Sequence, residues 1–188
     1  MDLDFASLNY FTRRFRNRQK NATIAPRLYA VPLGSATKEG QFLTIALCFI
    51  LAYLIGSIPS GVWVGQAFFH QDIRQSGSHN IGTTNAYRVL GPVGGSIVLV
   101  MDILKGTLGA SFPIFFGIQQ HWLVLIVGLA AVAGHTFSIF IHFKGGKAVA
   151  TSAGICLAYD WKFFLICCAI FISLVILTSM VSIASTVG

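Results

Sequence analysis

Charge is scarce in this 188-residue sequence: Asp, Glu, Lys and Arg together make up 10% of it. A soluble domain carries roughly 25% charged residues, so a globular protein surrounded by water is nearly excluded. Hydrophobic residues make up 55%, which is also far too much for a disordered chain. The content of 16 Phe and 19 Gly is typical of a helical membrane protein, in which glycine allows close helix packing. We therefore expect an integral membrane protein.

Several catalytic motifs are absent as well. There is no HExxH motif and no pair of histidines at helical spacing, so we expect no metal site. No GxSxG nucleophile elbow is present, so a covalent serine mechanism has no support. The cysteines form no CxxC pair and lie inside apolar stretches, so we interpret them as buried hydrophobic residues. They are Cys48, Cys156, Cys167 and Cys168.

Residues 1–40 differ from the rest of the chain in polarity and charge. They hold seven Lys and Arg against three Asp and Glu, a net charge of +4, whereas residues 41–188 carry a net +3. We expect a basic N-terminal extension at 1–40 and a transmembrane domain at 41–188. In the extension, apolar residues at helical spacing allow a surface-lying helix, and a disordered leader is the alternative. The domain has too few basic residues to predict a nucleic-acid partner.

The hydropathy pattern predicts an all-α, polytopic transmembrane helical bundle of about five spans. Full-length spans are expected at 42–69, 93–117, 121–141 and 161–180. The apolar stretch at 148–159 is short for the roughly 20 residues that a helix needs to cross. The first span should be kinked or broken at Gly56-Ser57-Ile58-Pro59-Ser60-Gly61. Residues 181–188 look like the start of a further helix.

Basic residues between the spans indicate the orientation. The polar loop at 71–91 carries Arg74 and Arg88, and the loop at 142–147 carries Lys144 and Lys147. By the positive-inside rule, both loops are cytoplasmic. A single crossing from Phe42 would then place the basic extension outside. Either the extension is untypical or the first apolar stretch does not cross once.

The segment 77–88, with the sequence GSHNIGTTNAYR, is the richest polar stretch of the domain. Its glycines, Gly77 and Gly82, allow backbone N–H groups to converge on an anion. Arg88 adds a planar cation suited to phosphate. The alternative is a glycine-rich turn capped by ordinary turn residues. The neutral side-chain donors, which exceed what a turn needs, are Ser78, Asn80, Thr83, Thr84 and Asn85.

A second glycine-rich segment, Phe143-Lys144-Gly145-Gly146-Lys147-Ala148, opens a predicted helix. The start of a helix presents unpaired N–H groups and positive dipole, with Lys147 beside them. It is not a Walker A loop, which needs glycine at position 141 and Ser or Thr at 148. Two lysines marking the cytoplasmic boundary are the alternative. The presence of two such loops on one membrane face favours a shared polyanion site.

Charged residues also occur inside the predicted spans. Asp102 and Lys105 are three residues apart and therefore share a helix face. Charges within a span usually face a cavity or a partner, and a structural ion pair is one interpretation. His135 lies near the cytoplasmic end of the third span, where it could donate to a carbonyl group or act on a substrate.

Over roughly residues 45–188 the sequence resembles the bacterial acyl-phosphate:glycerol-3-phosphate acyltransferases of the PlsY type, which are integral membrane enzymes. The matching motifs keep the family's order and spacing. They are residues 56–61; Asp72-Ile73-Arg74 with residues 77–85 and 88–91; Asp102 with Lys105-Gly106; and Gly134-His135 with residues 144–151.

The resemblance implies transfer of a fatty acyl group from acyl phosphate to the sn-1 hydroxyl of glycerol 3-phosphate, giving lysophosphatidate and phosphate. It implies the bacterial inner membrane, membrane lipids as surroundings and no cofactor. By resemblance, the catalytic residues are Ser78, Arg88, Lys147 and Ser182. Phosphate binding is assigned to Gly77, Asn80, Gly82, Thr84, Asn85, Lys144, Gly145 and Gly146, with support from Asp102, Lys105 and His135.

The sequence departs from the family pattern in three ways. His79 and Ala148 stand where the family usually has glycine, and the added Cβ is tolerable only where φ is negative. The basic extension has no family counterpart. The family has seven spans and continues past residue 188, so the sequence looks C-terminally truncated. An inactive membrane remnant or assembly partner is therefore one alternative function, and a small anion channel or transporter is another.

Overall fold

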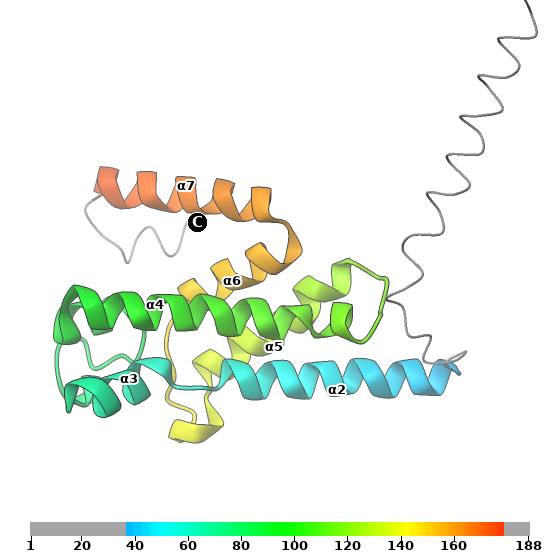
Figure 1. The fold of residues 1–188 in the computed structure, drawn as a ribbon, viewed down its shortest axis with the longest axis horizontal. Helices are drawn as coiled ribbons and strands as arrows, with labels where there is room; N and C mark the ends of the chain where they lie inside the picture. Colours follow the sequence, from blue (N-terminus) through cyan, green and yellow to red (C-terminus); the bar gives the residue numbers. More distant parts are fainter. Residues whose placement is uncertain (1–36, 179–188) are drawn as a thin grey trace, which may run out of the picture. The chain divides into compact units, whose positions relative to one another are not determined.

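The computed structural model describes residues 37–178, and from Lys38 onward these belong to one compact unit. This part is helical and contains no strand between residues 37 and 178, which confirms the all-α prediction. The basic extension up to residue 36 and the segment 179–188, with Ser182, lie outside the described residues. The elements are α2 (Lys38–Gly56), α3 (Ser60–Phe69), η2 (Ile73–Gln75), α4 (Thr83–Phe115), α5 (Trp122–Thr136), η3 (Ile139–Ile141), α6 (Val149–Tyr159) and α7 (Trp161–Thr178) (Figure 1).

Three helical stretches of the described residues are long and apolar enough to cross a membrane. They are Lys38–Phe69, Thr83–Phe115 and Trp122–Ile141. Two further apolar helices, Val149–Tyr159 and Trp161–Leu177, are shorter. The structure therefore gives spanning length to the first three predicted spans. Of the fourth, expected at 161–180, it describes helix α7 as far as Thr178.

The predicted break in the first span is confirmed. Helix α2 ends at Gly56 and α3 begins at Ser60, with Pro59 before its first residue. Proline lacks an N–H group and restricts the residue before it, so the α2 ladder of hydrogen bonds cannot continue through this position. The break leaves the carbonyl group of Ile58 available to a side chain from another helix, described below.

Helix α4 is not straight, although its residues run from Thr83 to Phe115. Gly91 has φ 74° and ψ −173°, which separates a short helix at 83–90 from a long one at 92–115. The short helix folds back on the long one, as the distance of 2.9 Å between Tyr87 Oη and Ser96 Oγ shows. The long segment corresponds to the span predicted at 93–117. The short one corrects our expectation for 71–91, which we had interpreted as a polar loop throughout.

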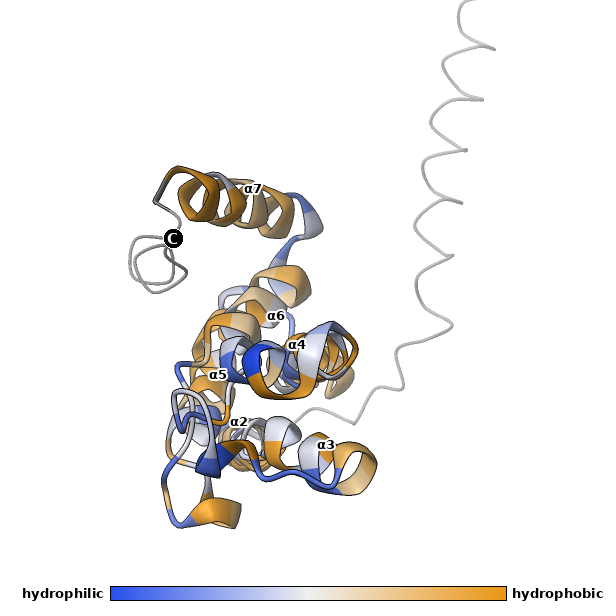
Figure 2. Cartoon of the chain, turned by 90° about the vertical axis from the view of Figure 1, so that its left-hand side faces the viewer, coloured by the Kyte–Doolittle hydropathy of each residue, from blue (hydrophilic) through white to orange (hydrophobic). Residues whose placement is uncertain are grey.

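Helix α4 is the centre of the bundle and packs against α2, α3, α5 and α6, whereas α7 packs on α6 (Figure 1). Small residues let the helices approach closely: a Cβ at Gly56 of α2 would lie 2.1 Å from the carbonyl oxygen of Ala131 in α5. Large apolar side chains such as Leu43, Leu129 and Ile176 are exposed. Figure 2 shows hydrophobic residues along the helices, as expected of a bundle surrounded by lipid.

Candidate active site

Asn85 organises the first candidate loop from its centre. It is 1% exposed, and its Oδ1 accepts a hydrogen bond from the backbone N–H of Ser78 at 2.8 Å. Its Nδ2 donates to the carbonyl groups of Ile73 and Asn80, both at 2.8 Å. These bonds occupy the amide of Asn85 with backbone partners. Asn85, for which we expected phosphate binding, therefore also supports the loop backbone, and its contact with phosphate stays a prediction.

Ser78, Thr84 and Arg88 are exposed in this loop, as are His79 and Tyr87. Thr84 and Arg88 are four residues apart on the short helix of α4 and therefore share one face. Gly77 packs against the stem of Arg88, because a Cβ at Gly77 would lie 3.2 Å from Arg88 Cδ. The first turn of the helix leaves N–H groups without intrahelical partners. The loop thus combines hydroxyl groups, a guanidinium and a helix start.

Asn80 and Gly82 shape the loop just before the helix begins. Asn80 Oδ1 accepts a hydrogen bond from the N–H of Gly82 at 3.0 Å, and Gly82 is the residue that precedes the first turn. This is a local turn of the kind that Asn commonly forms. In this structure both residues contribute to loop shape.

The second candidate loop is held against the end of α5 by its two glycines. The N–H of Gly145 donates to the carbonyl group of Thr136, and that of Gly146 to the carbonyl group of His135, both at 3.0 Å. A Cβ at Gly145 would lie 1.9 Å from the His135 oxygen, and one at Gly146 would lie 2.3 Å from His135 Nε2. The backbone therefore fits only without side chains here. Lys144 and Lys147 on either side are exposed.

The backbone at His79 and Ala148 is left-handed, with φ of 59° and 58°. Our condition that the extra Cβ needs a negative φ is therefore not met at either position. A non-glycine residue in this region is strained, although His tolerates it better than most. His79 gains one contact there, because its Nδ1 lies 3.0 Å from the carbonyl oxygen of Arg74. Ala148, which is buried directly before α6, gains no such contact among the bonds of the described residues.

Asp102 is the buried centre of a polar cluster between the two loops. Lys105 Nζ lies 2.8 Å from its Oδ1, which confirms that the two form an ion pair on one helix face. Thr83 Oγ1 donates to Oδ2 at 3.1 Å, and Ser60 Oγ donates to Oδ1. His135 Nδ1 lies 3.9 Å from Oδ1. Sequence reasoning found the ion pair but missed Ser60 and the contact with Thr83, since neither is close to Asp102 in the sequence.

Asp72 and Arg74 form an ion pair on the loop before the first candidate site. Arg74 Nη2 lies 2.6 Å from Asp72 Oδ2, and the N–H of Arg74 also donates to Oδ1. Hydrogen bonding by the guanidinium holds the pKa of Asp72 below its usual value and raises the pKa of Arg74. Because Arg74 is paired with Asp72, Arg88 is the exposed arginine of this region that forms no ion pair within residues 37–178.

An apolar cavity of about 240 Å³ lies on the outer side of this cluster. Its walls come from α2, α3 and α4 and the break between the first two, and Ser60 and Lys105 stand at its polar edge. The other lining residues are Ile55, Ile58, Met101, Leu104 and Leu108. Within residues 37–178, no three His, Cys, Asp or Glu side chains are grouped so that they could hold a metal ion.

Comparison with known proteins agrees with this arrangement. The family model described as glycerol-3-phosphate acyltransferase matches residues 46–188. A curated glycerol-3-phosphate acyltransferase of Lacticaseibacillus casei (strain BL23) is 74% identical over 146 residues, which are 78% of this chain and 70% of the relative. One of Latilactobacillus sakei subsp. sakei (strain 23K) is 64% identical over 146 residues, or 78% of this chain and 71% of the relative.

A solved structure shares the fold. It is the crystal structure of PlsY, an integral membrane glycerol 3-phosphate acyltransferase, in its glycerol 3-phosphate form. The TM-score is 0.69 at 35% sequence identity, and the match covers 76% of this chain and 70% of PlsY. A second PlsY structure, the lysophosphatidic acid form, matches with a TM-score of 0.68. This chain therefore belongs to the glycerol-3-phosphate acyltransferase family of integral membrane acyltransferases.

Proposed function

We propose that this protein transfers a fatty acyl group from acyl phosphate to the sn-1 hydroxyl of glycerol 3-phosphate, giving lysophosphatidate and phosphate. The observation that carries the proposal is the pair of glycine-rich loops that expose Arg88 and Lys147 and contact one buried cluster around Asp102. Both substrates carry a phosphate group, and acyl phosphate also carries a hydrocarbon chain. Two cationic loops on an apolar bundle suit that pair of ligands.

Each loop has a distinct part in the proposed site. The guanidinium of Arg88 is a planar donor that pairs well with phosphate oxygens. The exposed hydroxyl groups of Ser78 and Thr84 would add neutral donors, and Lys147 a second positive charge. Ser182, which lies outside the described residues, is retained as a catalytic residue on the resemblance alone. We retain the other predicted residues of the two loops as phosphate-binding residues: Gly77, Asn80, Gly82, Asn85, Lys144, Gly145 and Gly146.

The proposed reaction needs no protein nucleophile. Acyl phosphate is a mixed anhydride, so the hydroxyl oxygen of glycerol 3-phosphate attacks the acyl carbon directly and the bond from that carbon to the phosphate oxygen breaks. The hydroxyl proton ends on the departing phosphate, which balances the reaction. Arg88 and Lys147 would hold the phosphate groups and neutralise charge that builds on the leaving oxygen. Positioning and electrostatic stabilisation of this kind supply large parts of enzymatic rate enhancements.

The apolar cavity beside Ser60 and Lys105 supports an acyl substrate. It is open on the lipid side, since Leu104 and Leu108 of its wall are 58% and 42% exposed. We propose that part of the acyl chain lies there. The loops would face the cytoplasm of a bacterial inner membrane, as the positive-inside rule predicts. Labelling of a Lys144→Cys variant by an impermeant maleimide, in inverted vesicles against intact cells, tests this orientation.

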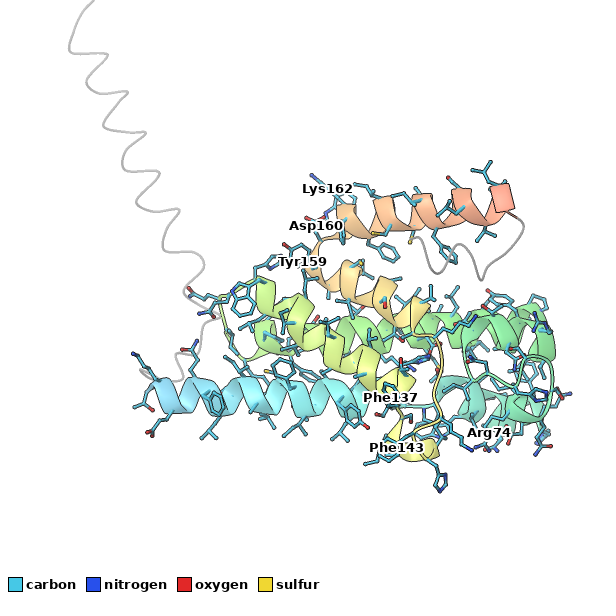
Figure 3. All side chains as sticks on the ribbon, turned by 180° about the vertical axis from the view of Figure 1, so that it is seen from behind. Arg74, Phe137, Phe143, Tyr159, Asp160 and Lys162 are labelled. Carbon is cyan, nitrogen blue, oxygen red and sulfur yellow. The ribbon has the colours of Figure 1, made fainter. Side chains whose placement is uncertain are left out.

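The decisive experiment follows labelled glycerol 3-phosphate in membranes that contain this chain. Acyl phosphate and acyl-CoA are supplied in parallel, and lysophosphatidate is measured. We expect product from acyl phosphate only, and a loss of at least about 10-fold in Lys147→Ala, the effect of removing one charged contact. Lys162→Ala is the matched control, because Lys162 lies across the bundle from Arg74 and Phe143 (Figure 3).

The remaining outcomes separate the alternatives. Product from acyl-CoA would overturn the proposed donor. No product from either donor, in protein shown to be inserted in the membrane, would indicate an inactive remnant or assembly partner. Phosphate flux through sealed vesicles would indicate an anion channel or transporter. Unchanged kinetics in Lys147→Ala would remove Lys147 from the site.

A further inference from the structure

The carboxylate of Asp102 lies between the two candidate loops: it accepts a hydrogen bond from Thr83 of the first, and it faces His135, against which Gly146 of the second loop packs. It is 1% exposed and lies in the long segment of α4. An isolated charge inside a membrane-spanning bundle is costly, so its partners are expected to be specific. Asp102 Oδ1 faces Lys105, Ser60 and His135, and Oδ2 faces Thr83.

The first arm of this cluster runs through Thr83. Its hydroxyl donates to Asp102 Oδ2 at 3.1 Å, although the two residues are 19 apart in the sequence. A straight helix would separate them by about 28 Å, so the contact depends on the reversal at Gly91. Thr83 is the first residue of the helix that carries Thr84 and Arg88. The bond therefore ties the start of that helix to the membrane span.

The second arm runs through His135. Its imidazole is 3% exposed, and its Nδ1 has no hydrogen-bond partner among the described residues. Nδ1 lies 3.9 Å from Asp102 Oδ1, and a movement of about 1 Å would bring it to hydrogen-bond distance. The other ring nitrogen, Nε2, lies under Gly146. Any movement of this ring toward Asp102 therefore also changes the support of the loop that ends in Lys147.

Lys105 completes the cluster without reaching either loop. Its Nζ pairs with Asp102 and donates to the carbonyl group of Ile58 at 2.9 Å, in the break between α2 and α3. This ion pair neutralises the buried carboxylate and fixes it to the frame of the bundle. Asp102 is thus anchored on one side and linked to each loop on the other.

We propose that Asp102 is a positioning residue that fixes the position of the two loops relative to each other. It acts on the first loop through Thr83 and on the second through His135. This inference rests on the proposed acyl-transfer function. When substrate phosphate draws the loops together, His135 Nδ1–H donates to Asp102 Oδ1 and the cluster closes. Asp102 itself does not touch the substrate. The linkage makes the effects of Thr83 and His135 on turnover interdependent, although these two side chains bond to Asp102 and not to each other.

The test is a double-mutant cycle on kcat/KM for glycerol 3-phosphate, with Thr83→Val and His135→Leu. We expect each single variant to lower kcat/KM about 10-fold, the effect of one lost hydrogen bond, and the double variant to fall well short of the product of the two. Thr83→Ser keeps the hydroxyl and should restore near-normal kinetics. Ser111→Ala is the control, since Ser111 donates only to the carbonyl group of Thr107 in the same helix. Asp102→Asn should lose more than either single variant.

A purely structural role predicts a different pattern. If Thr83→Val lowers the melting temperature in detergent while the folded fraction keeps normal kcat/KM, or if the double variant shows the full product, the inference is wrong. Stabilisation of the protein by glycerol 3-phosphate gives a readout that needs no acyl donor. Wild-type protein that is stabilised but makes no product would refute the proposed acyl transfer and leave the linkage intact. Loss of this stabilisation in Thr83→Val but not in Thr83→Ser would still support the linkage. Equal stabilisation of wild type and Thr83→Val would overturn it.

Discussion

The side-chain oxygen of Asn85 accepts a hydrogen bond from the backbone N–H of Ser78 at 2.8 Å, across seven residues of the loop that leads into α4. The amide nitrogen of the same side chain donates to the carbonyl groups of Ile73 and Asn80. One buried amide thus sets the backbone that carries Ser78. Asn85, which we expected to contact phosphate, therefore also supports the backbone of its loop.

Asn85→Asp should therefore unfold the loop. The carboxylate can still accept from Ser78, but it places an oxygen against the carbonyl groups that Nδ2 now serves. We expect a loss of about 1–3 kcal/mol in the free energy of unfolding. Thermal unfolding in detergent measures it. Asn80→Asp is the control, because Asn80 uses only its oxygen, toward Gly82, and should change stability little. Equal losses in both variants would contradict the role of Asn85.

Gly145→Ala should displace the lysine loop. The new methyl group would lie 1.9 Å from the backbone oxygen of His135, which cannot rotate away as a side chain can. Overpacking of this kind costs about 1–3 kcal/mol, and we expect turnover to fall at least as far as in Lys147→Ala. Gly117→Ala serves as the comparison, because a Cβ there meets nothing within 4 Å, although its φ of 72° adds strain. Normal turnover in Gly145→Ala would mean that the loop does not need its present position.

Ala148→Gly should stabilise the protein. Ala148 is left-handed (φ 58°), a conformation that costs a residue with a Cβ about 1 kcal/mol and glycine almost nothing. We expect a higher melting temperature in the variant. Ala150→Gly, within helix α6, is the matched control and should lower it, because glycine is a poor helix former. A decrease in both variants would show that the strain at Ala148 is absent.

The ion pair Asp72–Arg74 should make the stability of the first loop depend on pH in the acidic range. The guanidinium of Arg74 lowers the pKa of Asp72, so the folded state binds the proton less readily than the unfolded chain does. This contribution to stability is full above the ordinary pKa of Asp, about 3.9, and is lost as the pH falls below it. The melting temperatures of wild type and Asp72→Asn should differ at pH 7 and converge toward pH 3. If the difference in melting temperature stayed constant from pH 7 to pH 3, the ion pair would not be its cause.

Much of the helix arrangement could be predicted from the sequence, because hydropathy and proline determine structure through residues that are close in the chain. The break around Pro59, the span that begins after Gly91 and the shared face of Asp102 and Lys105 all depend on residues close in the chain. The short helix at 83–90 was missed because its polar residues are typical of a loop. The sequence signal for a break between two helices was Gly91-Pro92, because glycine allows an unusual backbone conformation and proline suits the first turn of a helix.

The roles within the site were harder to foresee because they depend on contacts across the fold. An asparagine suits both phosphate binding and loop support, and the sequence does not report that the amide of Asn85 is buried and bonded to the loop backbone. The contact between Thr83 and Asp102 exists because the chain reverses at Gly91, and no spacing in the sequence reports it. The left-handed backbone at His79 is likewise uncommon for a residue other than glycine, and the sequence alone does not report it.

The reversal at Gly91 also fixes an order of assembly during synthesis. Thr83 leaves the ribosome 19 residues before Asp102, so the bond between them forms only after the long segment of α4 has been synthesised. The lysine loop follows later still, since it needs the end of α5 to rest on. The contacts that join the two loops to the bundle are therefore completed only after the helices that supply Asp102 and His135 have been made.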